Sequence, residues 1–323
     1  MSGLILLPMM LAGSLVIMAV SSHFAVASME RIIEFTGLSE AAAGIGILAV
    51  MTSAPEMTVA LFSVLQGAPG IAIGDILGSN VFNLGAIMGI LGMIGFLKTC
   101  CPDTVMITQL TDILFLTALI PILIVIFEIA TPVVGVILFG VFILNIHSMT
   151  KKRTLIPVAK EEEKPSIPKT DRFSRIVKDR KIAVVAILIL SLAGLMTAGS
   201  LVVSSGTGIA TLLGAPPILV GAKIVSLGTS LPELTLDLTA ARRGRVQMAL
   251  GDIVGSNLMN LTFVLGLVFI TSSFTVDTTI FSEILPFLLI TTLIFWRFLM
   301  RGEISKVGGS LLLVSYILFL IIV

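Results

Sequence analysis

Two short polar motifs each occur twice in this apolar chain. A T-S-x-P-E motif at residues 52–56 recurs at 229–233, and a G-D-I-x-G-S-N motif at 74–80 recurs at 251–257. The copies lie 177 residues apart, and aligning 44–85 with 221–262 gives 18 identities in 42 positions without a gap. An internal duplication therefore repeats carboxylates, hydroxyls and prolines at fixed spacing.

The acidic residues of these motifs lie in stretches apolar enough to cross a membrane. Hydrophobic residues make up 56% of the 323 residues and charged ones only 12%, far from the balance of a soluble domain. Ionisable side chains at membrane depth are costly, so they mark an ion or substrate pathway. We expect an integral membrane protein. Nothing in the sequence suggests nucleic-acid binding or a bound cofactor, and it identifies no protein partner.

Both copies of the T-S-x-P-E motif place a proline in the middle of an expected span. Pro55 and Pro232 each remove one backbone hydrogen bond and clash with the carbonyl four residues back, which belongs to Met51 or Gly228. Such carbonyls are tolerated at membrane depth only where they are buried in protein or line a cavity. Hydroxyls flank both breaks, and they either face the same cavity or bond back to their own helix.

Hairpin geometry brings the aspartate of each repeat to the depth of its glutamate. The turn lies about ten residues after the glutamate and about eight before the aspartate, roughly 12–15 Å from both at 1.5 Å per residue. All-oxygen coordination with several carboxylates suits Ca²⁺, and the same oxygens can bind Na⁺. The candidate metal-ion ligands are Glu56, Glu233, Asp75, Asp252, Thr52, Ser53, Thr229, Ser230 and the carbonyls of Met51 and Gly228.

The hydropathy pattern predicts an all-α polytopic membrane protein with ten transmembrane helices. The expected spans cover about 20 residues each, at residues 3–28, 39–65, 71–97, 106–128 and 132–149, then 182–205, 215–241, 246–272, 278–298 and 304–322. The first run lacks a cleavage motif, so we expect it to be retained. Five helices per repeat (1–150 and 182–323) force the second repeat to enter the membrane from the opposite side.

Basic residues predict the orientation. If the short linker at 151–181 is cytoplasmic, 19 of the 20 Lys and Arg residues lie on the cytoplasmic side, as the positive-inside rule requires. Both termini are then outside the cell membrane. The remaining base, Lys223, falls within a span, where it snorkels, pairs with a neighbouring helix or forms an electrostatic gate.

Several further residues have more than one interpretation. Asp237 occurs only in the second repeat, where it either lines a vestibule or pairs with a base such as Arg242. The glycines that flank the aspartates are small enough to let helices approach closely. These are Gly74, Gly78, Gly251 and Gly255.

At both motifs the sequence resembles the cation/calcium exchanger superfamily, most closely its sodium/calcium exchanger branch. The resemblance implies that Glu56 and Glu233, with Asp75 and Asp252, bind the transported ions, helped by the neighbouring hydroxyls. Met51 departs from the family's usual glycine, and Asp75 stands where sodium-coupled members often have asparagine. The short linker resembles prokaryotic-type members, which lack a regulatory domain.

This resemblance favours a secondary antiporter, not an enzyme, that exchanges Ca²⁺ for Na⁺ by alternating access. The alternative is exchange of Ca²⁺ or another cation for H⁺, because crowded carboxylates can carry protons. A remote alternative is an intramembrane aspartyl protease with paired Gly-Asp motifs. Residue 72 is Ala, however, so the first pair lacks the G-x-G-D form.

The predicted orientation can be checked by cysteine labelling. A cysteine in place of Ser166, in the linker, should react with a membrane-impermeant reagent only after the cells are permeabilised. A cysteine in place of Ser2 should react in intact cells. The opposite pattern would invert the topology.

Overall fold

The computed structural model describes residues 2–36, 50–98, 104–127, 131–153, 181–244, 246–271 and 278–323. Every regular element in these ranges is a helix. Most of the predicted linker (154–180), and the part of the predicted second span at 39–49, lie outside the described residues.

The helices follow the predicted spans closely, with two of them interrupted. The first half contains α1 (Ser2–Thr36), α3 (Ala54–Leu65), α4 (Pro69–Val81), the π-helix η1 (Phe82–Ile87), α5 (Met88–Ile94), α6 (Thr104–Phe127) and α7 (Pro132–Arg153). The second contains α9 (Lys181–Leu213), α10 (Pro217–Val220), the π-helix η2 (Gly221–Val225), α11 (Ser226–Thr229), α12 (Leu231–Arg242), α13 (Val246–Met259), the π-helix η3 (Asn260–Val264), α14 (Leu265–Thr271), α15 (Thr278–Leu299) and α16 (Lys306–Ile322).

The length and apolarity of these helices make this a multi-pass membrane protein. Within the described residues, five helices can each cross a membrane, and a bent pair formed by Pro217–Thr229 and Leu231–Arg242 raises the number to six. Four more helices are apolar but shorter: Ala54–Leu65, Leu110–Ile126, Pro132–Asn145 and Lys306–Ile322.

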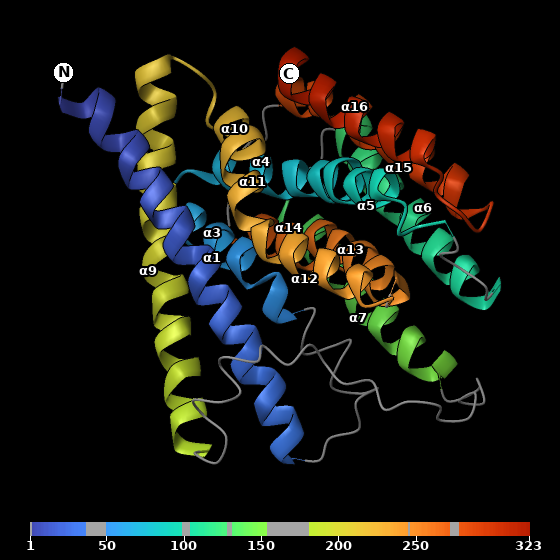
Figure 1. The fold of residues 1–323 in the computed structure, drawn as a ribbon. Helices are drawn as coiled ribbons and strands as arrows, with labels where there is room; N and C mark the ends of the chain where they lie inside the picture. Colours follow the sequence, from blue (N-terminus) through green and yellow to red (C-terminus); the bar gives the residue numbers. More distant parts are fainter. Residues whose placement is uncertain are drawn as a thin grey trace.

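The two longest helices, α1 and α9, lie side by side along one edge of the molecule (Figure 1). Several residues related by the 177-residue offset are buried on both helices. Met18 and Leu195 are both buried, as are Ala25 and Val202. The duplication therefore extends from the polar motifs to the first helix of each repeat.

The breaks predicted at the two prolines are present. Pro55 lies in the first turn of α3 and Pro232 in that of α12. The chain turns at Ser230 between α11 and α12, and the two parts of this span are bent by 42°. The preceding serines have nearly the same backbone angles, φ −81° and ψ 8° at Ser53 and φ −88° and ψ 9° at Ser230. Both repeats thus break at the same place and in the same way.

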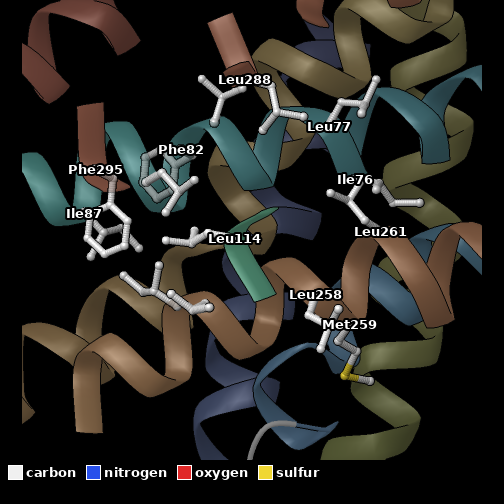
Figure 2. Close-up of a cluster of buried hydrophobic side chains, with 14 of the residues drawn as sticks. Ile76, Leu77, Phe82, Ile87, Leu114, Leu258, Met259, Leu261, Leu288 and Phe295 are labelled. Carbon is white, nitrogen blue, oxygen red and sulfur yellow. The ribbon is translucent and has the colours of Figure 1, made fainter. Parts of the chain in front are cut away.

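An apolar core holds α4, α6, α13 and α15 around the polar motifs. Figure 2 shows Ile76 of α4 beside Leu261, and Leu77 of α4 beside Leu288 of α15. Leu258 and Met259 lie together on α13 in the same cluster. These side chains are almost completely buried. The carboxylates of α4 and α13 are therefore attached to helices that cannot shift separately without opening the core.

Close packing at glycine joins α4 to the first half of the α10–α12 span. A Cβ atom added at Gly78 would lie 2.6 Å from Ser226 Oγ and 2.7 Å from Ala222 Cα. Gly74 meets the same backbone, so the prediction of close approach is confirmed for the first repeat. It is wrong for Gly251 and Gly255 as far as the described residues go, since a Cβ there would meet no atom within 4 Å. The repeats share these glycines but not their packing.

Replacing Gly78 with valine should destabilise the fold. The added atoms collide with backbone, which cannot rotate away, and overpacking of this kind costs about 1–3 kcal/mol or more. Gly140→Val is the matched control, because a Cβ at Gly140 on α7 meets nothing within 4 Å. Size-exclusion chromatography after stepwise heating in detergent should show a clearly lower midpoint for Gly78→Val alone. Equal midpoints would contradict the described packing.

Candidate ion-binding site

The four duplicated carboxylates lie on interrupted or buried helices. Glu56 and Glu233 occupy the first turns of α3 and α12, immediately after the breaks, and each is 1% exposed. Asp75 lies in α4 and is fully buried, whereas Asp252 in α13 is only half-buried. The site is therefore more open at Asp252 than at Asp75.

Hydroxyls of the second repeat reach the carboxylates of the first. Thr229 donates to Asp75 Oδ1 over 2.8 Å, and Ser230 donates to Glu56 Oε1 over 3.4 Å. Ser79 lies 3.4 Å from the Thr229 hydroxyl. Hydrogen bonds to a charged acceptor are stronger than neutral ones, so these contacts fasten one repeat to the other at the centre of the molecule.

Buried oxygens without a hydrogen-bond partner among the described residues occur in both repeats. Ser53 Oγ is buried without a hydrogen-bond partner, and Thr52 is buried beside it. Glu233 Oε2 and Asp252 Oδ2 also have no partner. Glu56 Oε2 and Asp75 Oδ2 are in the same condition, so both repeats contain buried carboxylate oxygens without a donor among the described residues.

A bound cation would stabilise the buried carboxylate oxygens that lack hydrogen-bond donors. A buried polar group without a hydrogen bond costs free energy, and a buried charge costs far more unless it is paired. The sequence predicted four carboxylates together, but among the described residues no three acidic, His or Cys side chains are close enough to share a metal ion. Like charges repel, and here hydroxyls stand between them.

The residues that precede the two breaks differ in packing. Met51 has a large side chain, which is buried with 8% of its surface exposed. Gly228 instead lies beneath Leu15 of α1, whose Cδ1 would be 2.7 Å from an added Cβ. The α1 helix therefore covers the break of the second repeat. The assignment of the Met51 and Gly228 carbonyls as ion ligands stays a prediction.

Four asparagines that were not predicted as ligands lie at the junctions of α4 with η1 and of α13 with η3. Asn80 and Asn257 end the repeated second motif, and Asn83 and Asn260 follow it. Asn80 and Asn257 each donate to the other's backbone carbonyl over 3.4 Å. Asn83 donates to Asn257 Oδ1 over 3.0 Å, and Asn260 donates to Asn80 Oδ1 over 3.3 Å. Equivalent residues that exchange contacts are characteristic of a two-fold relation.

A signal for these asparagines existed in the sequence. Asn83 and Asn260 align at the 177-residue offset, just beyond the second motif. Their side-chain oxygens are buried and have no partner among the described residues. Both lie in π-helical turns, which are rare and frequently occur at functional sites. We therefore add both amide oxygens to the candidate ligands.

The structure also bears on the two unpaired charged residues. Lys223 lies in η2, half-buried, and no described acidic residue forms an ion pair with it, so the pairing interpretation lacks support. Asp237 in α12 is completely buried, and neither of its oxygens has a partner in the described ranges. Its expected partner Arg242 is exposed.

These features define a class of protein: a helical multi-pass membrane protein with carboxylates at broken helices, built to pass cations through its interior. The family model for "Sodium/calcium exchanger protein" matches residues 6–150 and 183–323. The chain therefore belongs to the sodium/calcium exchanger family. This is a transporter family, so the remote alternative of a protease is wrong.

Several characterised and uncharacterised relatives are similar over most of their length. The chain is 28% identical to the sodium/calcium exchanger MaX1 of Methanosarcina acetivorans, over 95% of each chain. It is 29% identical to the putative antiporter CaxA of Alkalimonas amylolytica, over 85% of each chain.

Two solved structures share the fold. The sodium-calcium exchanger NCX_Mj, studied with Na⁺ and Sr²⁺, matches with a TM-score of 0.63 at 25% identity and 99% coverage of both chains. The H⁺/Ca²⁺ exchanger CAX matches with a TM-score of 0.79 at 17% identity, over 98% of this chain and 82% of that one. At that identity the second likeness shows the fold alone.

Proposed function

We propose that this protein exchanges Ca²⁺ for Na⁺ across the membrane by alternating access. The observation that carries the proposal is the contact of Thr229 and Ser230 with Asp75 and Glu56 across the two repeats. These contacts bring carboxylate and hydroxyl oxygens together in the buried interior, and such oxygens are the ligands that hard cations prefer. The named relatives MaX1 and NCX_Mj, both sodium/calcium exchangers, support the same pair of ions.

In this proposal the duplicated motifs supply the ion ligands. Glu56, Glu233, Asp75 and Asp252 carry the charge, and hydroxyls, amide oxygens and the carbonyls at the breaks complete the coordination. One Ca²⁺ or several Na⁺ would bind to the same oxygens, so the two ions compete. Competition for one site, with opening to one side at a time, is what an exchanger requires.

The proposed architecture is ten spans in two inverted repeats, 1–150 and 182–323, joined by a cytoplasmic linker at 151–181 in a multi-pass cell-membrane protein with both termini outside. The reciprocal contact between Asn80 and Asn257 supports a two-fold axis between the repeats. In this topology the turn between α12 and α13 lies on the linker side of the membrane. The turn between α3 and α4 lies on the opposite side.

The two sides are packed differently, which supports alternating access. On the outer side α9 covers α3: Gly199 lies against Thr58, which is 9% exposed. On the linker side the equivalent Thr235 of α12 is exposed, and so is Gly251 next to Asp252. The two repeats share one sequence pattern, so each can adopt the packing that the other has in this structure. If the repeats exchanged their packing, the linker side would close and the outer side would open.

A polar contact holds the closed side together. Gln66, at the end of α3, donates to the carbonyl and hydroxyl of Ser200 over 3.2 Å, and accepts from Ser204 over 3.0 Å. The offset relates Gln66 to Arg243, and the two serines to His23 and Ala27. The same contact is therefore not possible on the linker side.

The alternative partner ion is H⁺, and Asp75 is the feature that favours it. With Asp75 ionised, the four carboxylates carry a formal charge of −4 against +2 from one Ca²⁺, and like charges this close cannot all remain ionised. Uptake of ⁴⁵Ca²⁺ into proteoliposomes under separate Na⁺, K⁺ and H⁺ gradients distinguishes the two exchanges. We expect the Na⁺ gradient to drive uptake. Uptake driven by H⁺ alone would favour the alternative.

Glu56→Gln and Glu233→Gln should each abolish ⁴⁵Ca²⁺ flux while the protein stays folded. A neutral amide is easier to bury than a charge, so monodisperse elution in detergent should be retained. Glu283→Gln, on an exposed part of α15, is the control and should transport normally. Near-normal flux in either site variant would refute the assigned ligands.

Removing the outer contact should open that side more often. The background variant has Cys100 and Cys101 replaced by serine and a single cysteine in place of Thr58. Its labelling rate measures how often α9 separates from α3 and exposes residue 58. Adding Ser200→Ala and Ser204→Ala should speed its labelling from outside by up to about tenfold, since each lost hydrogen bond contributes about 0.5–1.5 kcal/mol. Thr211→Ala on α9 is the control, because its hydroxyl bonds only within the helix. Unchanged labelling would show that the contact does not hold the side closed.

A further inference from the structure

Asp237 is a buried carboxylate that the duplicated site does not explain. The first repeat has Ala60 at the equivalent position, so Asp237 does not belong to the repeated ligand set. Its side chain is 0% exposed, and both of its oxygens have no hydrogen-bond partner within the described ranges. An acidic group buried at membrane depth without a donor needs a positive charge from elsewhere.

The position of Asp237 points to the source of that charge. It follows Glu233 by four residues on α12, so the two carboxylates lie on the same face of the helix, one turn apart. This helix packs against α13, and Asp237 lies within electrostatic range of Asp252 as well as of Glu233. Asp252 is half-buried and is therefore the most accessible of the three carboxylates.

The basic side chains in the described part of the chain do not fill this role. Arg242 and Arg243, at the end of the same helix, are exposed, and Asp237 is buried away from them. Lys223 precedes the break and lies in the other half of the span. Gly251 is exposed beside Asp252, so a cation from that side would approach Asp237 past Asp252.

We propose that Asp237 and Asp252 form a second cation site, which takes Ca²⁺ on the linker side before the ion moves past Glu233 to the centre. The inference rests on the proposed Ca²⁺ transport and adds an asymmetry to it. Only one of the two access routes has such a site, because Ala60 stands in the other repeat. A carboxylate-lined approach raises the local cation concentration, so Ca²⁺ is captured more readily from the linker side.

The test measures Ca²⁺ dependence separately at each face of the full-length protein in oriented proteoliposomes. Asp237→Asn keeps the shape of the side chain, and Asp237→Ala installs the residue that the first repeat already has. Asp112→Asn on α6 is the control, since it removes an exposed carboxylate elsewhere. Both Asp237 variants should raise the half-saturating Ca²⁺ concentration at the linker face by about tenfold. At the outer face the shift should stay within about twofold.

Equilibrium dialysis of the purified proteins with ⁴⁵Ca²⁺ provides the second measurement. Wild type should bind one more Ca²⁺ per chain than either Asp237 variant, and all must elute as single symmetric peaks in detergent. Equal shifts at both faces, or no shift with equal binding, would overturn the second site. If the wild-type protein transports no Ca²⁺, the proposed function is wrong. The dialysis measurement then still shows whether Asp237 binds a cation.

Discussion

The centre of this molecule is governed by the cost of keeping carboxylates away from water inside a membrane. Glu56 and Asp75 meet that cost in part through hydroxyls that arrive from the other half of the chain. One buried oxygen on each of the four carboxylates still has no partner among the described residues. In the proposed exchanger, bound cations stabilise these oxygens, so ion binding is linked to the conformation of the protein.

The breaks in the helices follow from the same constraint. A continuous helix satisfies all its own backbone groups and offers none to an ion. At Pro55 and Pro232 the helix stops and restarts, so that the first-turn glutamates point from a helix N-terminus, where negative charge is favoured. The prolines thus place the acidic side chains and stabilise them at once.

Much of this could be predicted from the sequence because it depends on local rules. Apolar runs of sufficient length predicted the helices, and the two prolines predicted the breaks. The contact of Thr229 with Asp75 could not be predicted, because it depends on how far one repeat is shifted against the other. No role in the site was predicted for the asparagines at 80 and 257, because a neutral amide in a membrane span is a weaker signal than a charged side chain. The unequal packing of the repeats was also beyond reach, since both copies carry nearly the same motif.

The backbone contact between α4 and the α10–η2 segment has a consequence for how the chain is made. Gly74 and Gly78 are covered by residues that are synthesised about 140 positions later. Until then the helices of the first half lie in the bilayer with Gly74 and Gly78 uncovered and with Asp75 lacking its hydroxyl partner. Biogenesis ends only when the second half docks, so a chain arrested midway through translation is an exposed, acidic intermediate for the cell's membrane quality control to recognise.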